Sequence, residues 1–134
     1  MEREQHRKFE NIENNEELVR RRFIISDELY TQLLTVAEER QITPNQLLVN
    51  VLKNEVQLLT NSSPEEQRGL VDGYKRLNSE DDGGSGYIRK LFLPNNLNDS
   101  LESFAANHQI TPGIMIVAAI AITREAGNNL PGKF

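Results

Sequence analysis

The four residues QITP stand at 41–44 and again at 109–112, so the second copy begins 68 residues after the first. Sliding the chain by that offset, without a gap, also brings identical residues together on both sides of the echo. The identical pairs are Arg21 with Arg89, Leu29 with Leu97, Leu33 with Leu101, Ala37 with Ala105 and Val49 with Val117. Matches at one fixed offset over about forty residues indicate an internal duplication.

Each copy begins with a segment that has the length and composition of a β-strand, VRRRFII (19–25) in the first and YIRKLFL (87–93) in the second. Both are rich in β-branched and aromatic residues, which strands favour. After the first segment, Ser26 and Asp27 supply side chains that accept hydrogen bonds from the free N–H groups of a starting helix. In the second copy Pro94 ends the strand, because proline has no N–H for a β-ladder.

A first helix is predicted after each strand, because apolar residues recur there at helical spacing. These residues are Leu29, Leu33, Val36 and Ala37 in one copy and Leu97, Leu101, Phe104 and Ala105 in the other. QITP then starts a second helix, in which Thr43 is a good N-cap and Gln46, three residues later, completes a capping box. The second helices are expected to end near Leu59 and near Ala126, with Gly127 as a C-cap.

A strand and two helices cannot bury their apolar faces alone in about forty residues, so the two copies need each other. We expect residues 19–25 and 87–93 to pair as an antiparallel ribbon, with the four helices packed beneath it. The predicted fold class is therefore mainly α with a two-stranded antiparallel ribbon, in which duplicated strand-helix-helix units form an intramolecular pseudo-dimer.

The stretches RRRFIISDELYTQLLTVAEERQITPNQLLVNVL (20–52) and YIRKLFLPNNLNDSLESFAANHQITPGIMIVAAI (87–120) resemble the ribbon-helix-helix family of DNA-binding proteins. Its members are usually homodimers of single units, and their antiparallel ribbon enters the major groove of DNA. The resemblance implies a ribbon-helix-helix pseudo-dimer within one chain, similar to tandem members known among some plasmid-transfer proteins. Such a duplication removes concentration-dependent assembly and lets the two half-ribbons diverge to read an asymmetric DNA site.

The resemblance also implies a role for each position of the ribbon. Since alternate residues of a strand share a face, one set points into the core. This inner set is Phe23, Ile25, Leu91 and Leu93. The implied base-reading residues on the outer face are Arg20, Arg22, Ile24, Ile88, Lys90 and Phe92. Arg22 and Lys90 are the clearest readers, because arginine and lysine bound to guanine are the commonest base-specific contacts. Arg21 and Arg89 fall on the inner side, at frayed ribbon ends, where we expect their charged heads to reach water.

The N-termini of the two second helices are the implied phosphate clamps. Backbone N–H groups and the helix dipole favour an anion there. The residues carried over to this role are Thr43, Asn45, Thr111 and Gly113.

Two features depart from the family pattern and keep alternatives open. Ile24 and Phe92 stand where the family typically has a polar or basic residue, and an apolar pair there suits either thymine methyl groups or a protein partner. The net charge is −5, whereas many DNA-binding proteins are basic. We expect a sequence-specific duplex-DNA-binding protein, a transcriptional regulator. The alternatives are an accessory factor for plasmid transfer or partition, and a protein-interaction module, antitoxin-like or an adaptor.

Composition restricts the cellular context and the chemistry. The chain has no cysteine, which excludes disulfides and thiolate zinc sites. The charged N-terminus lacks the apolar stretch of a signal peptide. The longest apolar run, IMIVAAIAI (114–122), is about half the ~20 residues that span a bilayer. We therefore expect a cytoplasmic protein without a membrane partner.

No enzyme activity, metal or cofactor is expected from the sequence. His6 and His108 are far apart and lack the spacing of metal ligands. The stretch NSEDDGGSG (78–86) has neither the acid spacing of a calcium loop nor the Lys-Ser/Thr ending of a phosphate loop. No Ser-His-Asp set or pair of catalytic carboxylates is recognisable.

The repeat divides the chain into five segments. Unit 1 spans 19–59 and unit 2 spans 87–127, and together they form one domain. The N-terminal tail (1–18) and the linker (60–86) each carry net charge −3, and a C-terminal tail covers 128–134. Within the linker a short helix is expected near 64–77, followed by a flexible acidic stretch. We expect a monomer, and further association on DNA stays open.

Overall fold

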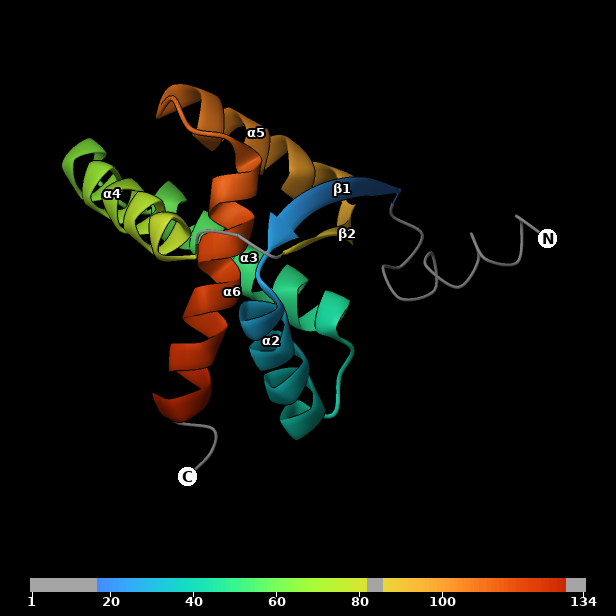
Figure 1. Ribbon diagram of the computed structural model, residues 1–134. Helices are drawn as coiled ribbons and strands as arrows, with labels where there is room; N and C mark the ends of the chain where they lie inside the picture. Colours follow the sequence, from blue (N-terminus) through green and yellow to red (C-terminus); the bar gives the residue numbers. More distant parts are fainter. Residues whose placement is uncertain (1–16, 82–85, 130–134) are drawn as a thin grey trace.

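The computed structural model describes residues 17–81 and 86–129. The predicted N-terminal tail, the acidic stretch after Asp81 and the C-terminal tail lie mainly outside these residues. The elements are β1 (Leu18–Ile25), α2 (Asp27–Arg40), α3 (Pro44–Thr60), α4 (Pro64–Glu80), β2 (Tyr87–Pro94), α5 (Asn95–Asn107) and α6 (Pro112–Asn129). Strand-helix-helix thus occurs twice in one chain, with α4 between the two units (Figure 1).

The two strands pair antiparallel in a single two-stranded sheet, as the sequence predicted. Their register runs from Leu18 opposite Pro94 to Ile25 opposite Tyr87. Arg22 lies opposite Lys90, and the repeat offset of 68 also makes these two residues equivalent. A local twofold axis between the units therefore passes through this pair. The strand pairing and the sequence repeat thus place the centre of the pseudo-dimer at the same two residues.

The inner face of the ribbon seals the core, and its composition confirms the predicted alternation. The buried members are Phe23, Ile25, Leu91 and Leu93. Beneath them α6 runs through the middle of the helices, in contact with α2, α3, α4, α5 and β1 (Figure 1). All residues from Met115 to Ala121 are buried, which explains why this helix is apolar on every side.

Within the described residues, no single helix is both long enough and apolar enough to cross a membrane. The helices α5 and α6 meet that test only as a pair, and they are bent by 108° at the break between them.

The QITP echo has the same backbone in both units. Gln41 and Gln109 adopt left-handed conformations, with φ of 60° and 59°. The next residue then donates its N–H back into the preceding helix, from Ile42 to the Ala37 carbonyl (3.1 Å) and from Ile110 to the Ala105 carbonyl (2.9 Å). This is the usual way to end one helix and satisfy its last carbonyls before the next begins.

Several expected helix ends differ from those observed. Thr43 caps α3, but Gln46 does not complete a capping box. Its amide donates instead to the Asn50 side chain (2.9 Å), one turn along the same helix face. The capping box forms at the start of α4, between Ser63 and Glu66.

The expected helix end near Ala126, with Gly127 as a C-cap, is also wrong, since α6 continues through Gly127 to Asn129. The linker helix is longer than predicted and ends at Glu80 rather than near residue 77. At the start of α5, Pro94 is the N-cap and provides no side-chain hydrogen bond. The Asn95 N–H bonds the Glu17 carbonyl instead (2.9 Å), so the end of β2 is tied to the start of β1.

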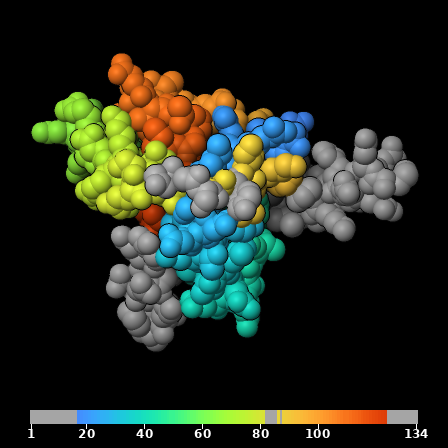
Figure 2. Space-filling model, viewed as in Figure 1, coloured from blue at the N-terminus to red at the C-terminus, as the bar shows by residue number. Residues whose placement is uncertain are grey.

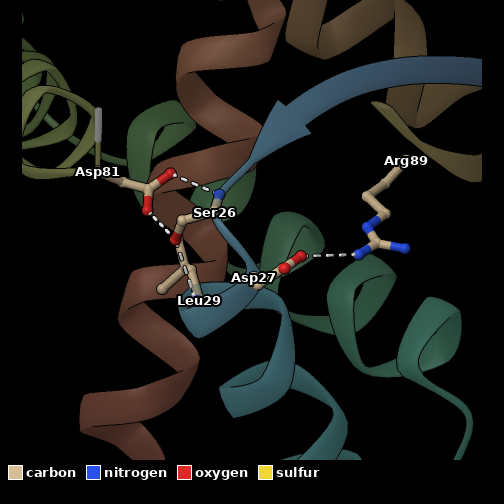
Figure 3. Close-up of polar contacts among 5 residues, drawn as sticks. All are labelled: Ser26, Asp27, Leu29, Asp81 and Arg89. Carbon is tan, nitrogen blue, oxygen red and sulfur yellow. Dashed lines mark hydrogen bonds and ion pairs between the residues drawn. The ribbon is translucent and has the colours of Figure 1, made fainter. Parts of the chain in front are cut away.

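The linker helix α4 is part of the fold rather than a loose connection. It packs along α6, and its Val71 and Tyr74 are buried. At its C-terminal end the Asp81 carboxylate accepts hydrogen bonds from the Ser26 N–H (3.2 Å) and the Ser26 hydroxyl. The same hydroxyl oxygen accepts from the Leu29 N–H (3.2 Å), so Asp81 supports the N-cap of α2 (Figure 3).

Tyr74 connects α4 to α3 through a hydrogen bond from its hydroxyl to Glu55 Oε1 (2.7 Å). Burial raises the pKa of Tyr74, and the bond to the Glu55 carboxylate and its charge raise it further. Because the folded pKa lies above the ordinary value, the neutral phenol stabilises the fold fully below pH ~10, and this contribution is lost as pH rises further.

We therefore expect the stability advantage of wild type over Tyr74→Phe to fall as the pH rises above ~10, with a slope of at most about 1.4 kcal/mol per pH unit. Urea unfolding of both proteins at closely spaced pH values measures this difference. The phenylalanine variant titrates all the other groups in the same way, so it is the control. Parallel stability curves above pH ~10 would contradict the assignment.

Candidate nucleic-acid interface

The outer face of the ribbon presents most of the predicted base-reading residues to solvent. Its exposed members are Arg20, Arg22, Ile24, Ile88 and Lys90, and Phe92 is half-buried. The two isoleucines are 57% and 61% exposed, more than Leu34 and Leu58, the other exposed large apolar side chains among the described residues. In Figure 2 the atoms of β1 and β2 lie at the surface, between those of α5 and α2.

Among the described residues of β1 and β2, the charge on this face is entirely positive. Arg20, Arg22 and Lys90 provide it, and none of the other outward residues is acidic. Among the described residues, these three cations form no ion pair. Arg22 and Lys90 are direct cross-strand partners, an arrangement that destabilises a sheet when both charges have the same sign. The chain keeps this unfavourable pair although its net charge is −5.

We expected the charged heads of Arg21 and Arg89 to extend into water. Instead, both side chains are held by the first helix of the other unit. Arg21 on β1 donates from Nε to Asn98 Oδ1 on α5 (2.7 Å) and pairs with Glu102. Arg89 on β2 pairs with Asp27 on α2 at 3.3 Å, as Figure 3 shows. Its guanidinium also stacks 3.9 Å from the centre of the Tyr30 ring.

These contacts separate two classes of arginine that look alike in the sequence. Arg21 and Arg89 fasten each strand to the opposite unit, so they stabilise the pseudo-dimer. Arg20 and Arg22 remain on the exposed face. The signal for this division was present in the alignment, since Arg21 and Arg89 match at the repeat offset as an identical pair.

The N-terminus of α3 contacts the ribbon through Asn45, which sequence reasoning had given only to phosphate clamping. The Asn45 amide donates to the Phe92 carbonyl (3.0 Å), and its oxygen accepts from the Phe92 N–H (2.8 Å). The side chain thus forms hydrogen bonds with both main-chain groups of Phe92 at the outer edge of β2. At this helix end Thr43 is exposed, and its hydroxyl accepts from the Gln46 N–H (3.0 Å). Pro44 has no N–H, so the Asn45 N–H is the one first-turn donor that remains for a ligand among the described residues.

The N-terminus of α6 lacks this contact. Gly113 stands at the position equivalent to Asn45 and has no side chain to reach β1. Thr111 is exposed, and its hydroxyl accepts from the Ile114 N–H (3.4 Å). The two predicted clamps are therefore chemically different although they occupy equivalent places.

Replacing Asn45 with alanine is expected to lower the free energy of unfolding by about 1–2 kcal/mol, because the two part-buried hydrogen bonds between its side chain and the Phe92 main chain are lost. Urea unfolding measures the change. Asn50→Ala is the matched control, since this exposed asparagine only accepts a bond from Gln46 on its own helix. Equal losses in the two variants would show that the Asn45–Phe92 bonds contribute nothing specific.

Two grooves flank the ribbon at equivalent positions. One of about 320 Å³ lies between β2 and α3 and includes Asn45 and Phe92 in its lining. The other, about 410 Å³, lies between β1 and α6 and includes Ile24 and Gly113. A larger pocket of about 640 Å³ lies among α2, α4 and α6, with an acidic rim that includes Asp27, Glu28 and Glu80. No group of three or more histidine or acidic side chains in the described part of the chain is placed to hold a metal ion.

Comparison of this chain with known protein families, with curated proteins and with solved structures finds no match. The geometry and charge of the ribbon therefore carry the functional argument.

Proposed function

We propose that this chain is a single-chain ribbon-helix-helix protein that binds duplex DNA and regulates transcription. A two-stranded ribbon has the dimensions to enter the major groove, about 12 Å wide. The residues in position to contact base edges are Arg20, Arg22 and Lys90. The main-chain N–H groups of Asn45 and Gly113, at the starts of α3 and α6 beside Thr43 and Thr111, then contact phosphates and fix the register.

The observation that carries the proposal is the Arg22–Lys90 centre of the exposed ribbon face, for which the described residues provide no ion-pair partner and no acidic neighbour on that face. Two like charges held opposite each other cost stability, and a polyanion placed over both removes that cost. The axis between the units passes through this pair, so a duplex centred there meets one unit on each side. The flanking outward residues differ, with Arg20 and Ile24 on β1 and Ile88 and Phe92 on β2, which suits an asymmetric site.

The direct test is titration of a fluorescent random-sequence duplex at about 50 mM and about 200 mM salt, followed by anisotropy. If the three ribbon cations each neutralise one phosphate or equivalent charge, affinity falls roughly 40-fold between these conditions. Selection from a random duplex library then identifies a preferred site. Failure to bind duplex at low salt, or affinity independent of salt, would refute the proposal.

A second candidate function is supported by one observation. The large exposed fractions of Ile24 and Ile88 suit a protein partner as well as thymine methyl groups. In that case the chain is an interaction module that keeps the fold without reading DNA. Salt-independent binding of a protein, with no binding of duplex, would favour it.

A further inference from the structure

The outer edge of β1 at Ile24 is open, whereas the equivalent edge of β2 is closed. In an antiparallel pair, residues alternate between those bonded to the other strand and those whose N–H and C=O face away from it. Phe92 faces away, since Asn45 binds both of its main-chain groups. Ile24, which lies opposite Ile88, has the same parity in the register and therefore also faces outward.

Among the described residues, nothing bonds the outward N–H or C=O of Ile24. The reason lies in the sequence. The repeat offset places Ile24 at the position of Phe92 and Gly113 at the position of Asn45. An asparagine therefore closes one edge, and its replacement by glycine leaves the other edge free. Natural proteins usually protect such edges, because they attract other strands.

The groove beside this edge has a shape and a lining that suit a polypeptide. It measures about 410 Å³, and Ile24, Ile88, Ile114 and Val117 give it an apolar wall. Arg22 also lines it, and none of the described residues that line it is acidic. A segment with an apolar side chain for the groove and an acidic one for Arg22 matches both features.

The Ile24 main chain needs both a donor and an acceptor from its ligand, and this need distinguishes a peptide from the DNA backbone. A phosphate offers only acceptors, so it cannot satisfy the Ile24 carbonyl. A peptide group offers one donor and one acceptor, as the Asn45 carboxamide does for Phe92. The closed edge of β2 thus demonstrates, within the same chain, the chemistry that the open edge of β1 lacks.

We infer that the β1 edge at Ile24, with its adjoining groove, binds an extended acidic segment of a partner protein as an added β-strand. Main-chain bonds to Ile24 supply affinity, and the groove and Arg22 supply selectivity. This site does not depend on DNA binding, although a segment seated on Arg22 occupies part of the ribbon face proposed to read bases.

The test uses a phage-displayed library of short random-sequence peptides, with the full chain and no DNA present. Wild type is compared with Gly113→Asn, which places a carboxamide where Asn45 has one, and with Gly113→Ala. A Cβ at position 113 meets only Thr111 Oγ1 at 3.6 Å, so alanine fits without closing the edge.

We expect enrichment of peptides that alternate acidic and apolar residues and bind wild type and Gly113→Ala about equally. Gly113→Asn should bind them at least about tenfold more weakly, since its side chain takes both main-chain groups. Hydrogen exchange of the Ile24 N–H in wild type should slow when the peptide is added, and this measurement does not depend on the variant.

The inference is overturned if no peptide is enriched, if Gly113→Asn keeps full affinity, or if Ile24 exchange is unchanged. Sedimentation provides a further check. If wild type self-associates where Gly113→Asn remains monomeric, a second copy of the chain takes the edge, and the partner segment is rejected. The DNA titration is a separate experiment, so either proposal can fail without the other.

Discussion

Replacing Ile25 with alanine is expected to lower the free energy of unfolding by about 2–5 kcal/mol, whereas replacing its neighbour Ile24 should change it by less than about 0.5 kcal/mol. The two substitutions remove the same atoms from adjacent positions of one strand. Ile25 is fully buried against the helices, and Ile24 is 57% exposed. The contrast therefore measures which face of β1 is the core.

The second strand offers the same comparison independently. Leu93 is fully buried and Ile88 is 61% exposed, so Leu93→Ala should cost as much as Ile25→Ala while Ile88→Ala should cost little. Urea unfolding followed by circular dichroism measures all four variants. A strand shifted by one residue would exchange its two faces, and the exposed variant would then be the costly one. That result would disprove the observed register.

The alternation that sets these faces is a local property, and for that reason the sequence predicted it. Strand period, helical spacing and the Thr-Pro helix start each involve residues only a few positions apart. The repeat added long-range information, because two equivalent strands in one chain pair most simply about an axis between them. The Arg22–Lys90 pair on that axis follows from the offset of 68 together with antiparallel pairing.

The contacts that sequence reasoning missed are tertiary. Asn45 reaches the edge of a strand 47 residues away, and Asp81 reaches Ser26 across 55 residues. No local pattern distinguishes an asparagine that caps or binds phosphate from one that closes a strand edge. The predicted end of α6 was wrong for a different reason, which concerns the backbone. Glycine stops a helix only where the backbone turns left-handed, and Gly127 remains helical.

The alignment of the two units nevertheless contained a usable signal in its differences. Positions 45 and 113 hold asparagine and glycine, and positions 24 and 92 hold isoleucine and phenylalanine. Once the fold is known, the first difference shows that one ribbon edge is closed and the other open. Identical positions in the repeat, such as Arg21 and Arg89, mark what holds the units together. Divergent positions, such as Asn45 and Gly113, mark where the two units make different contacts.

Neutralising the central pair, with Arg22→Gln and Lys90→Gln combined, is expected to weaken binding to a selected duplex by at least about 30-fold. Each base-contacting cation contributes about 1–3 kcal/mol to affinity. The salt dependence should also fall, because fewer counterions are released on binding. Anisotropy titrations at several salt concentrations measure both quantities.

A matched variant separates this effect from the change in net charge. Lys53→Gln combined with Arg68→Gln removes the same two charges from exposed helical positions, on α3 and α4. It should retain most of the affinity for the selected duplex. Comparable losses in the two double variants would mean that DNA responds to overall charge, and the ribbon would lose its assigned role.

The same double variant should change stability in the opposite direction: DNA affinity falls, but the free energy of unfolding rises. Arg22 and Lys90 are like charges directly across the strands, so removing them should stabilise the fold by roughly 0.2–1 kcal/mol. A substitution that damaged the fold would instead lower stability and affinity together. A more stable protein that binds DNA less well is the outcome expected only if the pair is kept for its ligand. A less stable double variant would indicate that the two side chains support the ribbon itself.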